Sequence, residues 1–240
     1  MSLNPLMVVM SVRDFPVFWY WNQQIDFVDK LIIKNYSHHE AHQIALEFFE
    51  EHPEYTHFLI STDDVLYTPC HVKLLFKDYL DHKLPVISAY SNWNFRSRWV
   101  NATLKDLRYL ERRKAFVRAS DYDFLSLDNV ITHSLDNPLL QVHFVGLPLT
   151  LIERWVLKKC PFKPFKWVYD KVLGYYTKRG IMFDLEFSNC CKNNNIPVHV
   201  DLRLLLMHFG NTRKHINLKG KKQEVKFIQA KKMIMPTLMF

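Results

Sequence analysis

The first ninety residues alternate between apolar, strand-like runs and segments with helical spacing. The strand-like runs lie at 6–12, 28–36, 57–61 and 85–90, and the apolar character of most of them is typical of strands buried on both faces. Ser37 is followed three residues later by Glu40, which is the pattern of a helix capping box, and apolar residues then recur at helical spacing. This alternation predicts an α/β protein with a central, mostly parallel sheet flanked by helices.

The second half of the chain has a less regular pattern. Residues 104–116 are compatible with a helix or with a charged strand. Further on, the pattern predicts a strand at 140–146, a helix at 148–159 that opens on a proline, a short helix at 182–195 and one or two strands within 196–210.

Polar side chains stand where three of the predicted strands end. Ser11 and Arg13 follow the first strand, Asn35 follows the second, and Asp63 and Asp64 follow the third. Ligands of open α/β sheets bind beyond the carboxyl ends of the strands. One aspartate is explained by capping of the next helix. The second adds like-charge repulsion, which a divalent cation would offset.

Three later residues extend this candidate site. Asp184 and Glu186 open the helix predicted at 182–195, and His208 ends an apolar strand. Carboxylate oxygens and an imidazole suit Mn²⁺ or Mg²⁺ bound to a diphosphate, and a separate carboxylate can act as a general base toward a hydroxyl group. The alternatives are that Asp184 only caps its helix and that His208 is a structural histidine.

Three stretches together resemble nucleotide-sugar-dependent glycosyltransferases of the GT-A fold. They are ISTDDV (60–65), FVGLPLTLIER (144–154) and MFDLEFSNCCKNNNIPVHVDLRLLLMHFG (182–210). The resemblance extends from about Leu6 to Gly210, and the compact length with few glycines is similar to small glycosyltransferases of archaeal viruses. It implies a single GT-A-like, Rossmann-related domain.

The resemblance also implies a set of roles. Asp63, Asp64 and His208 would hold Mn²⁺ or Mg²⁺ on the diphosphate of a nucleotide-sugar donor, and Asp184 would be the general base toward the acceptor hydroxyl, with an inverting outcome. The residues that would contact the donor are Ser11, Arg13, Asn35 and Gly146. The sequence departs from a strict D-x-D motif, because Ser61 stands two positions before Asp63. Either Asp63 and Asp64 act as a shifted pair, or one metal contact is weakened.

Two other functions are compatible with the same residues. A metal-dependent nucleotidyltransferase also places strand-end carboxylates around Mg²⁺, although it usually gathers three of them. A catalytically inactive GT-A-like interaction protein is compatible with the missing aspartate of the motif. The chain has no GxGxxG, Walker or GxSxG motif, which excludes dinucleotide-binding, P-loop and α/β-hydrolase sites of the usual kind.

The net charge of +8 is concentrated at the C-terminus. Residues 211–240 hold eight basic residues and one acidic residue, so residues 1–210 are nearly neutral. We therefore expect a catalytic domain at 1–210 and a basic extension at 211–240. The extension ends in apolar residues, which predicts peripheral membrane contact or protein docking that brings the domain to a lipid-linked or protein acceptor. Nucleic acid is a less favoured partner, because the body lacks a basic excess.

The remaining features indicate a cytoplasmic protein. The N-terminal residues lack the pattern of a signal peptide, and no apolar run is long enough for a membrane helix. The four cysteines have no CxxC spacing, so we expect reduced thiols and no disulfide framework.

Overall fold

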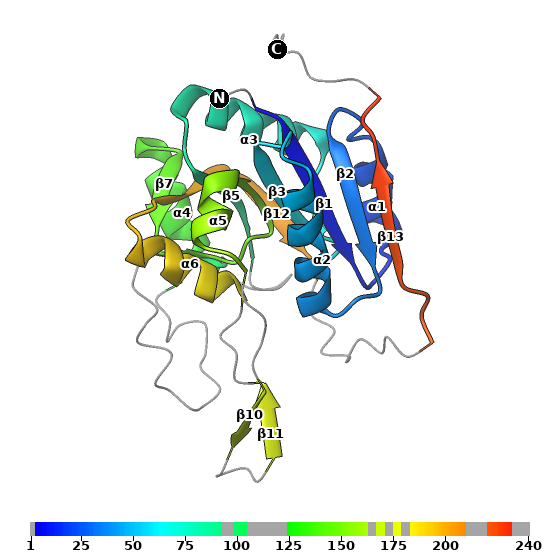
Figure 1. The fold of residues 1–240 in the computed structure, drawn as a ribbon. Helices are drawn as coiled ribbons and strands as arrows, with labels where there is room; N and C mark the ends of the chain where they lie inside the picture. The colour runs from blue at the N-terminus through cyan, green and yellow to red at the C-terminus, as the bar shows by residue number, and fades with distance from the viewer. Residues whose placement is uncertain are drawn as a thin grey trace.

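A nine-stranded sheet, counted over the described residues, lies between two layers of helices in the computed structural model of the chain (Figure 1). The structure describes residues 3–92, 98–104, 124–162, 167–170, 175–178, 183–209 and 220–231. The predicted segment at 104–116 lies almost entirely outside these ranges. The α/β class and the central sheet flanked by helices are confirmed.

The N-terminal half of the chain contains β1 (Pro5–Ser11), α1 (Pro16–Gln23), β2 (Asp29–Lys34), α2 (His38–Glu51), β3 (His57–Thr62), β4 (Val65–Leu66), α3 (Pro69–His82) and β5 (Val86–Ser91). The C-terminal half contains β6 (Ala102–Thr103), α4 (Leu127–Asp136), β7 (Leu139–Val142), β8 (Phe144–Val145), β9 (Leu149–Glu153), α5 (Arg154–Lys159), β10 (Trp167–Asp170), β11 (Tyr175–Lys178), α6 (Phe183–Asn193), β12 (Val198–His208) and β13 (Glu224–Ile228).

The central sheet has the strand order β13-β2-β1-β3-β9-β5-β12-β4, and β7 pairs with β12. Strands β2, β1, β3, β5 and β12 run in the same direction, because β1 is parallel to β2 and β3, β12 is parallel to β5, and β9 is antiparallel to both β3 and β5. The carboxyl ends of these five strands therefore meet at one edge of the sheet.

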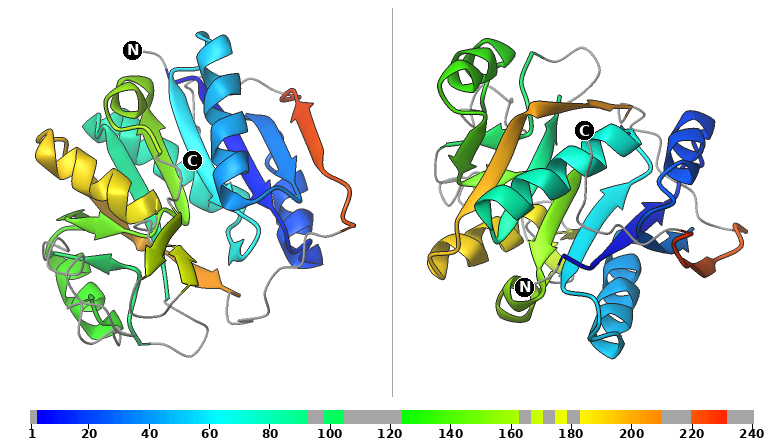
Figure 2. Two further views of the ribbon diagram at one scale, coloured as in Figure 1. Left: turned by 60° about the horizontal axis from the view of Figure 1, so that its bottom comes forward. Right: turned by 90° about the horizontal axis from the view of Figure 1, so that it is seen from above.

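Alternating residues of the strands supply two separate cores. In β1, Leu6, Val8 and Met10 pack in one core with residues of α2, α5 and α6. Met7 and Val9 pack in the other core with residues of α1 and α3. Figure 2 shows these helices on opposite faces of the sheet. Because both faces are covered, both alternating sets must be apolar, which explains the continuous apolar runs of the sequence.

The capping box predicted at the start of α2 is confirmed. The Glu40 amide donates to the Ser37 Oγ over 3.3 Å, and the Ser37 amide donates to the Glu40 Oε2 over 3.0 Å. These bonds satisfy backbone donors that the first turn of a helix leaves unpaired. They fix the point where the chain leaves the carboxyl end of β2.

The helix predicted at 148–159 is wrong in its first half. Residues Leu149–Glu153 form β9, which lies antiparallel between β3 and β5, and only Arg154–Lys159 are helical. Leu151 is paired with Leu59 on one side and with Ile87 on the other. The periodicity of a short apolar run does not distinguish a buried strand from a buried helix. Here the run forms a strand because β3 and β5 each leave one edge free to pair with it.

Part of the predicted basic extension belongs to the sheet. Residues 224–228 form β13, an antiparallel edge strand on β2. This pairing attaches part of the expected extension to the sheet, and the division into 1–210 and 211–240 stays a prediction. Residues 211–219 and 232–240 lie outside the described part of the chain.

The expectation of four reduced cysteines is also wrong. Cys160 at the end of α5 forms a disulfide with Cys190 of α6, with 5.5 Å between their Cα atoms. Cys70 and Cys191 have free thiols. No local pattern indicates this pair, because the two residues are 30 positions apart and meet only through the packing of their helices.

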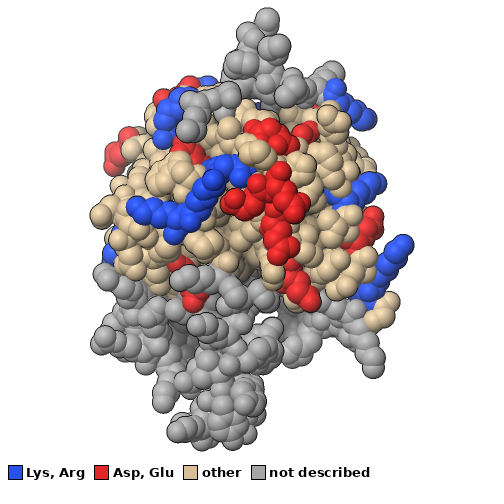
Figure 3. Space-filling view, viewed as in Figure 1, with Lys and Arg blue, Asp and Glu red and all other residues tan. Residues whose placement is uncertain are grey.

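The surface charge is unevenly distributed. Acidic side chains gather over α2 (Figure 3) and include the exposed residues Glu40, Glu47, Glu50, Glu51 and Glu54. Such a face repels the phosphate backbone of nucleic acids. Within the described residues, no helix has the length and apolar character needed to cross a membrane.

The disulfide can be tested by counting thiols. We expect an alkylating reagent to modify Cys70 and Cys191 alone in denatured, unreduced protein, and all four cysteines after reduction, as measured by intact mass. Replacing Cys190 by Ser should lower the melting temperature, because a cross-link that closes a loop of this size contributes roughly 2–4 kcal/mol. Cys70→Ser is the matched control and should leave the melting temperature unchanged. Modification of four cysteines before reduction would contradict the disulfide.

Candidate functional site

A tight turn at Asp63 and Asp64 connects β3 to β4 at the carboxyl edge of the sheet. Strand β4 pairs with the end of β12, so that Val65 lies opposite His208. The sheet therefore brings His208 to the two aspartates, as the sequence predicted. Neither aspartate caps α3, whose N-cap residue is Thr68, and the capping alternative is excluded.

The Asp63 carboxylate holds the loop that connects β1 to α1. Its side chain is fully buried. One oxygen, Oδ2, accepts hydrogen bonds from the Ser11 Oγ at 2.9 Å and from the backbone amides of Val12 at 2.9 Å, Arg13 at 2.6 Å and Asp14 at 3.1 Å. Consecutive amides that converge on one anion form a backbone nest. Asp63 thus fills an anion site made by the chain itself.

Two further contacts fix the outer side of this loop. The Asn35 amide donates to the Ser11 carbonyl over 2.9 Å, and the Lys221 Nζ donates to the Val12 carbonyl over 2.9 Å. Asp14 adopts a left-handed backbone conformation with φ at 54°, which is unfavourable for a residue other than glycine. The loop is therefore held in one conformation from both sides.

Asp64 is the centre of a polar cluster that reaches the surface. Its carboxylate accepts from the Thr62 Oγ1 at 2.7 Å, pairs with the Arg13 Nη1 at 2.9 Å and lies 3.4 Å from the His208 Nε2. Burial would raise the pKa of Asp64, but the hydrogen bond with His208, the charge of Arg13 and the hydrogen bond from Thr62 together lower that pKa below its usual range. Asp64 is thus ionised at any ordinary pH.

The two aspartates differ in their suitability as metal ligands. The Oδ2 of Asp63 already accepts four hydrogen bonds, whereas Asp64 and His208 are partly exposed and adjacent. Among the described residues, no three His, Cys, Asp or Glu side chains are arranged to hold a metal ion. A site with one carboxylate and one imidazole still fits Mg²⁺ or Mn²⁺, which keep water ligands and bind substrate phosphates. The metal assignment of Asp63, Asp64 and His208 stays a prediction, with Asp64 as the better-placed carboxylate.

The expected donor-contacting residues fall into two groups. Ser11, Arg13 and Asn35 lie together beside Asp63, and a small pocket lined in part by Ser11, Arg13 and Tyr36 opens there. Asn35 also has a left-handed backbone with φ at 61°, and its Nδ2 donates to the Lys222 carbonyl over 2.7 Å.

Gly146 lies apart from that group, near the carboxyl end of β5. A Cβ atom at Gly146 would come within 2.6 Å of the Asn101 Nδ2. The Asn101 Oδ1 in turn accepts from the Ser91 amide at 2.8 Å. The glycine is therefore required by a close contact inside the protein, and its expected contact with a donor sugar stays a prediction.

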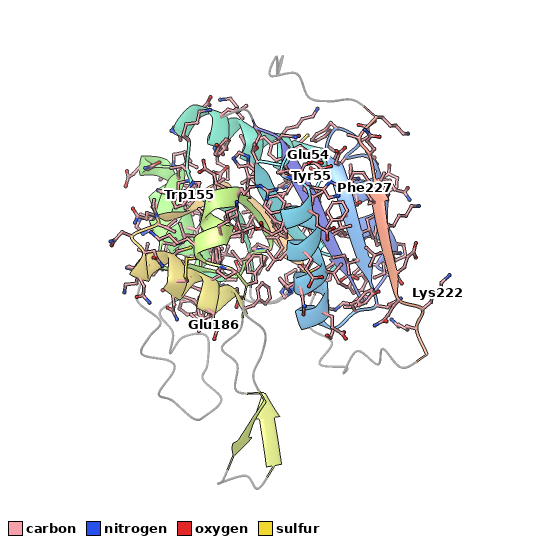
Figure 4. The ribbon with its side chains drawn as sticks, viewed as in Figure 1. Glu54, Tyr55, Trp155, Glu186, Lys222 and Phe227 are labelled. Atoms are coloured by element: carbon pink, nitrogen blue, oxygen red, sulfur yellow. A yellow bond between two sulfur atoms is a disulfide. The ribbon has the colours of Figure 1, made fainter. Side chains whose placement is uncertain are left out.

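Asp184 lies in the first turn of α6, on the same side of the molecule as the strand-end cluster. The ring of Phe183 is 4.1 Å from the ring of His42 in α2, so α6 begins beside the start of α2. Figure 4 shows Glu186 at this end of α6, and Figure 1 shows that the carboxyl ends of β1 and β2 point to the same side. Residues 179–182, which precede α6, lie outside the described ranges.

The environment of Asp184 changes its acidity. Its Oδ1 accepts a hydrogen bond from the amide of the next residue, Leu185, at 2.8 Å. An N-cap side chain accepts from an amide two or three positions further on, so this contact is not that of an N-cap residue. Burial raises the pKa of Asp184 to about 6, against the opposing effect of hydrogen bonds from the backbone amides of Leu185 and of Asp184 itself. A carboxylate with such a pKa is deprotonated at neutral pH and yet more basic than an exposed aspartate, which suits a general base.

Sequence reasoning missed two residues of this region. Thr62 orients the Asp64 carboxylate, and Lys221 holds the β1–α1 loop from the C-terminal segment. Thr62 could have been noticed because it directly precedes the aspartates. Lys221 gave no signal, because it is 209 positions from its partner and belongs to a run of similar basic residues.

Comparison with known proteins adds little to this description. No protein-family model matches the chain, and no curated protein sequence is significantly similar to it. The solved structures that are similar include the crystal structure of A197 from STIV, which matches over 89% of this chain and 97% of that chain, with 15% sequence identity and a TM-score of 0.46. Conclusions about this chain therefore depend on its own residues.

The different roles of the two aspartates lead to a paired prediction. Asp63→Asn should lower the free energy of unfolding by about 3 kcal/mol, because it replaces a buried charge that several donors share. Asp64→Asn should cost clearly less, because Asp64 is partly exposed. Denaturant unfolding of both variants measures the difference. Equal losses, or a larger loss in Asp64→Asn, would contradict the role given to Asp63.

Proposed function

We propose that the protein is a glycosyltransferase, which moves a sugar from a nucleotide-diphosphate sugar to a hydroxyl acceptor. The observation that carries this proposal is the cluster of Arg13, Asp64 and His208 at the carboxyl edge of the sheet. It combines a fixed cation, an ionised carboxylate and an imidazole at the place where open α/β sheets bind ligands. Asp184, with its raised pKa, stands on the same side of the molecule.

The donor would bind along the β1–α1 loop. Ser11, Arg13 and Asn35 are held there by bonds that do not require a ligand. A preorganised loop costs little free energy to order on binding. The Arg13 guanidinium, which pairs with Asp64, can also form a two-pronged contact with phosphate oxygens.

Asp64 and His208 would hold Mn²⁺ or Mg²⁺ against the diphosphate, with phosphate oxygens and water as the other ligands. The bound metal would stabilise negative charge on the leaving diphosphate. Asp64 is suited to this role because it is already ionised and already oriented by Thr62. Arg13 would neutralise the charge of the diphosphate that the metal leaves uncompensated. It would thereby offset in part the weaker metal binding that the missing first aspartate of the motif implies.

Asp184 would accept the proton of the acceptor hydroxyl as its oxygen attacks C1 of the sugar. The new bond forms between that oxygen and C1, and the bond from C1 to the diphosphate oxygen breaks, so that the nucleotide diphosphate leaves. Direct displacement of this kind inverts the configuration at C1. Glu186 in the same turn of α6 is the alternative base.

The other two functions have less support. A two-metal nucleotidyltransferase needs several carboxylates close together, whereas Asp63 is committed to its loop and Asp64 stands beside an imidazole. An inactive interaction protein would have no need of a raised pKa at Asp184. Hydrolysis assays with UDP-, GDP- and CDP-sugars separate these possibilities, because only a glycosyltransferase releases the sugar from the nucleotide diphosphate.

The acceptor and the cellular partners belong to the same proposal. The basic residues of the C-terminal segment would bring the domain to a lipid-linked or protein acceptor, or to an anionic membrane surface. Nucleic acid is the competing partner, and a steep dependence of binding on salt would identify it.

The metal role leads to a binding prediction. Nucleotide diphosphates should raise the melting temperature with Mn²⁺ and much less with EDTA, because the metal bridges Asp64 and the phosphates. Asp64→Asn should remove the difference between the two conditions, while Asp128→Asn on α4 is a control that should retain it. Equal nucleotide affinity with Mn²⁺ and with EDTA in the native protein would refute metal-dependent binding.

The base role leads to a kinetic prediction. Asp184→Asn should retain donor binding and reduce transfer by roughly 10²-fold or more, the usual contribution of a general base. Activity of the native protein should fall as the pH drops through about 6, because the base is then protonated. Glu186→Gln is the matched control from the same turn of α6. Full activity in Asp184→Asn, together with loss in Glu186→Gln, would reassign the role to Glu186.

A further inference from the structure

A second pocket, of about 550 Å³, lies on the α1 face of the sheet where β13 extends it beyond β2. Figure 2 shows β13 at this edge, next to β2. The pocket is lined by residues of α1, β2 and β13, by the segment between α1 and β2 and by the residues that follow β13. None of the residues assigned above to the donor or to catalysis lines it.

The strand register explains the composition of this pocket. Lys34, Ile32 and Lys30 of β2 are paired with Glu224, Lys226 and Ile228 of β13, so these six side chains share one face of the sheet. Ile25 and Val28 add apolar surface below them. The result is an apolar floor with charged groups along its rim.

The rim carries more positive than negative charge. Its basic residues are Lys34, Lys226 and Lys231, its acidic residues are Asp26 and Glu224, and Lys30 adds a further cation beneath them. Lys34 pairs with the half-exposed Asp14 over 3.0 Å. No ion pair joins Lys226 or Lys231 to another described residue.

Lys30 differs from the other lysines because it is buried. Its ammonium group donates to the Asn22 carbonyl and to the Asn22 Oδ1, the latter at 3.3 Å. Burial lowers the pKa of Lys30 to about 8, although the charge of Asp26 opposes this effect. Lys30 therefore adds positive charge beneath the pocket. Its ammonium group donates its hydrogen bonds to Asn22 and not to the pocket.

Trp19 supplies an unused hydrogen-bond donor at the Lys34 end. Its Nε1 is buried and has no hydrogen-bond partner among the described residues. The Lys34 Nζ lies 4.1 Å from the centre of the Trp19 ring. Buried N–H groups are nearly always paired in folded proteins. Because protein atoms enclose this N–H, an acceptor oxygen bound beside Lys34 would pair with it after a turn of the indole ring.

We propose that this pocket binds a single-chain amphiphile with an anionic phosphate or carboxylate head. The head would lie at the end formed by Trp19, Lys34 and Lys226, and the apolar chain would cover Ile32 and Ile228. The pocket volume falls within the range of about 300–1,000 Å³ that is usual for small-molecule sites. Glu224 lies opposite Lys34 at this end, so the preference for an anion over a neutral amphiphile depends on Lys226 and Lys231 and on the indole donor.

Binding of dodecyl phosphate to the full chain, below its micelle concentration, tests this proposal by titration calorimetry. We expect one saturable site, and we expect dodecyl maltoside and inorganic phosphate to bind at least tenfold more weakly. Lys226→Gln and Trp19→Phe should each weaken binding about fivefold, and Ala230→Trp, which adds bulk to the pocket lining, should abolish it. Lys222→Gln is the matched control, because Lys222 does not line the pocket and its side chain points away from the molecule in Figure 4.

Three outcomes would overturn the proposal. The first is the absence of saturable binding, and the second is unchanged affinity in Ala230→Trp and Lys226→Gln. The third is binding to vesicles of anionic phospholipid without binding of monomeric dodecyl phosphate, which would identify a membrane surface as the ligand. Because the readout is binding alone, the result does not depend on whether the protein transfers a sugar.

Discussion

The buried carboxylate of Asp63 is the contact on which the rest of the site depends. It satisfies three consecutive backbone amides and the Ser11 hydroxyl, and so fixes a loop that includes an unfavourable backbone conformation at Asp14. The position of Arg13 follows from this loop, and the pairing of Asp64 follows from Arg13. The Asp63 carboxylate therefore accepts the hydrogen bonds that the loop amides could otherwise donate to a ligand. A bound phosphate would contact the Arg13 side chain instead of these amides.

The sequence predicted those parts of the molecule that depend on local patterns. Strands buried on both faces appear as apolar runs in the sequence. These runs predicted the bounds of β1, β3 and β5 to within one residue at each end. The rule that parallel strands present their carboxyl ends at one edge placed Ser11, Asn35 and the Asp63–Asp64 pair together. His208 joined them because β12 runs in the same direction and ends beside β4.

The remaining features depend on contacts between distant segments, which a single sequence does not reveal. Strand β9 needs the free edges of β3 and β5, and the Cys160–Cys190 bond needs the packing of α5 against α6. The roles of Asp63 and Asp64 could not be separated either, because a carboxylate that anchors a loop and one that faces solvent look identical in the sequence. Only the backbone donors around Asp63 distinguish them.

The pairing of β13 with β2 has a consequence for the order of folding. The contacts of Lys221 with Val12 and of Asn35 with Lys222 span 209 and 187 positions. Contacts of such long sequence separation form late, since they require closure of nearly the whole chain. During synthesis, β2 stays an open strand edge until residues 224–228 have left the ribosome. The β1–α1 loop thus gains its final support only after Lys221 and Lys222 have reached it.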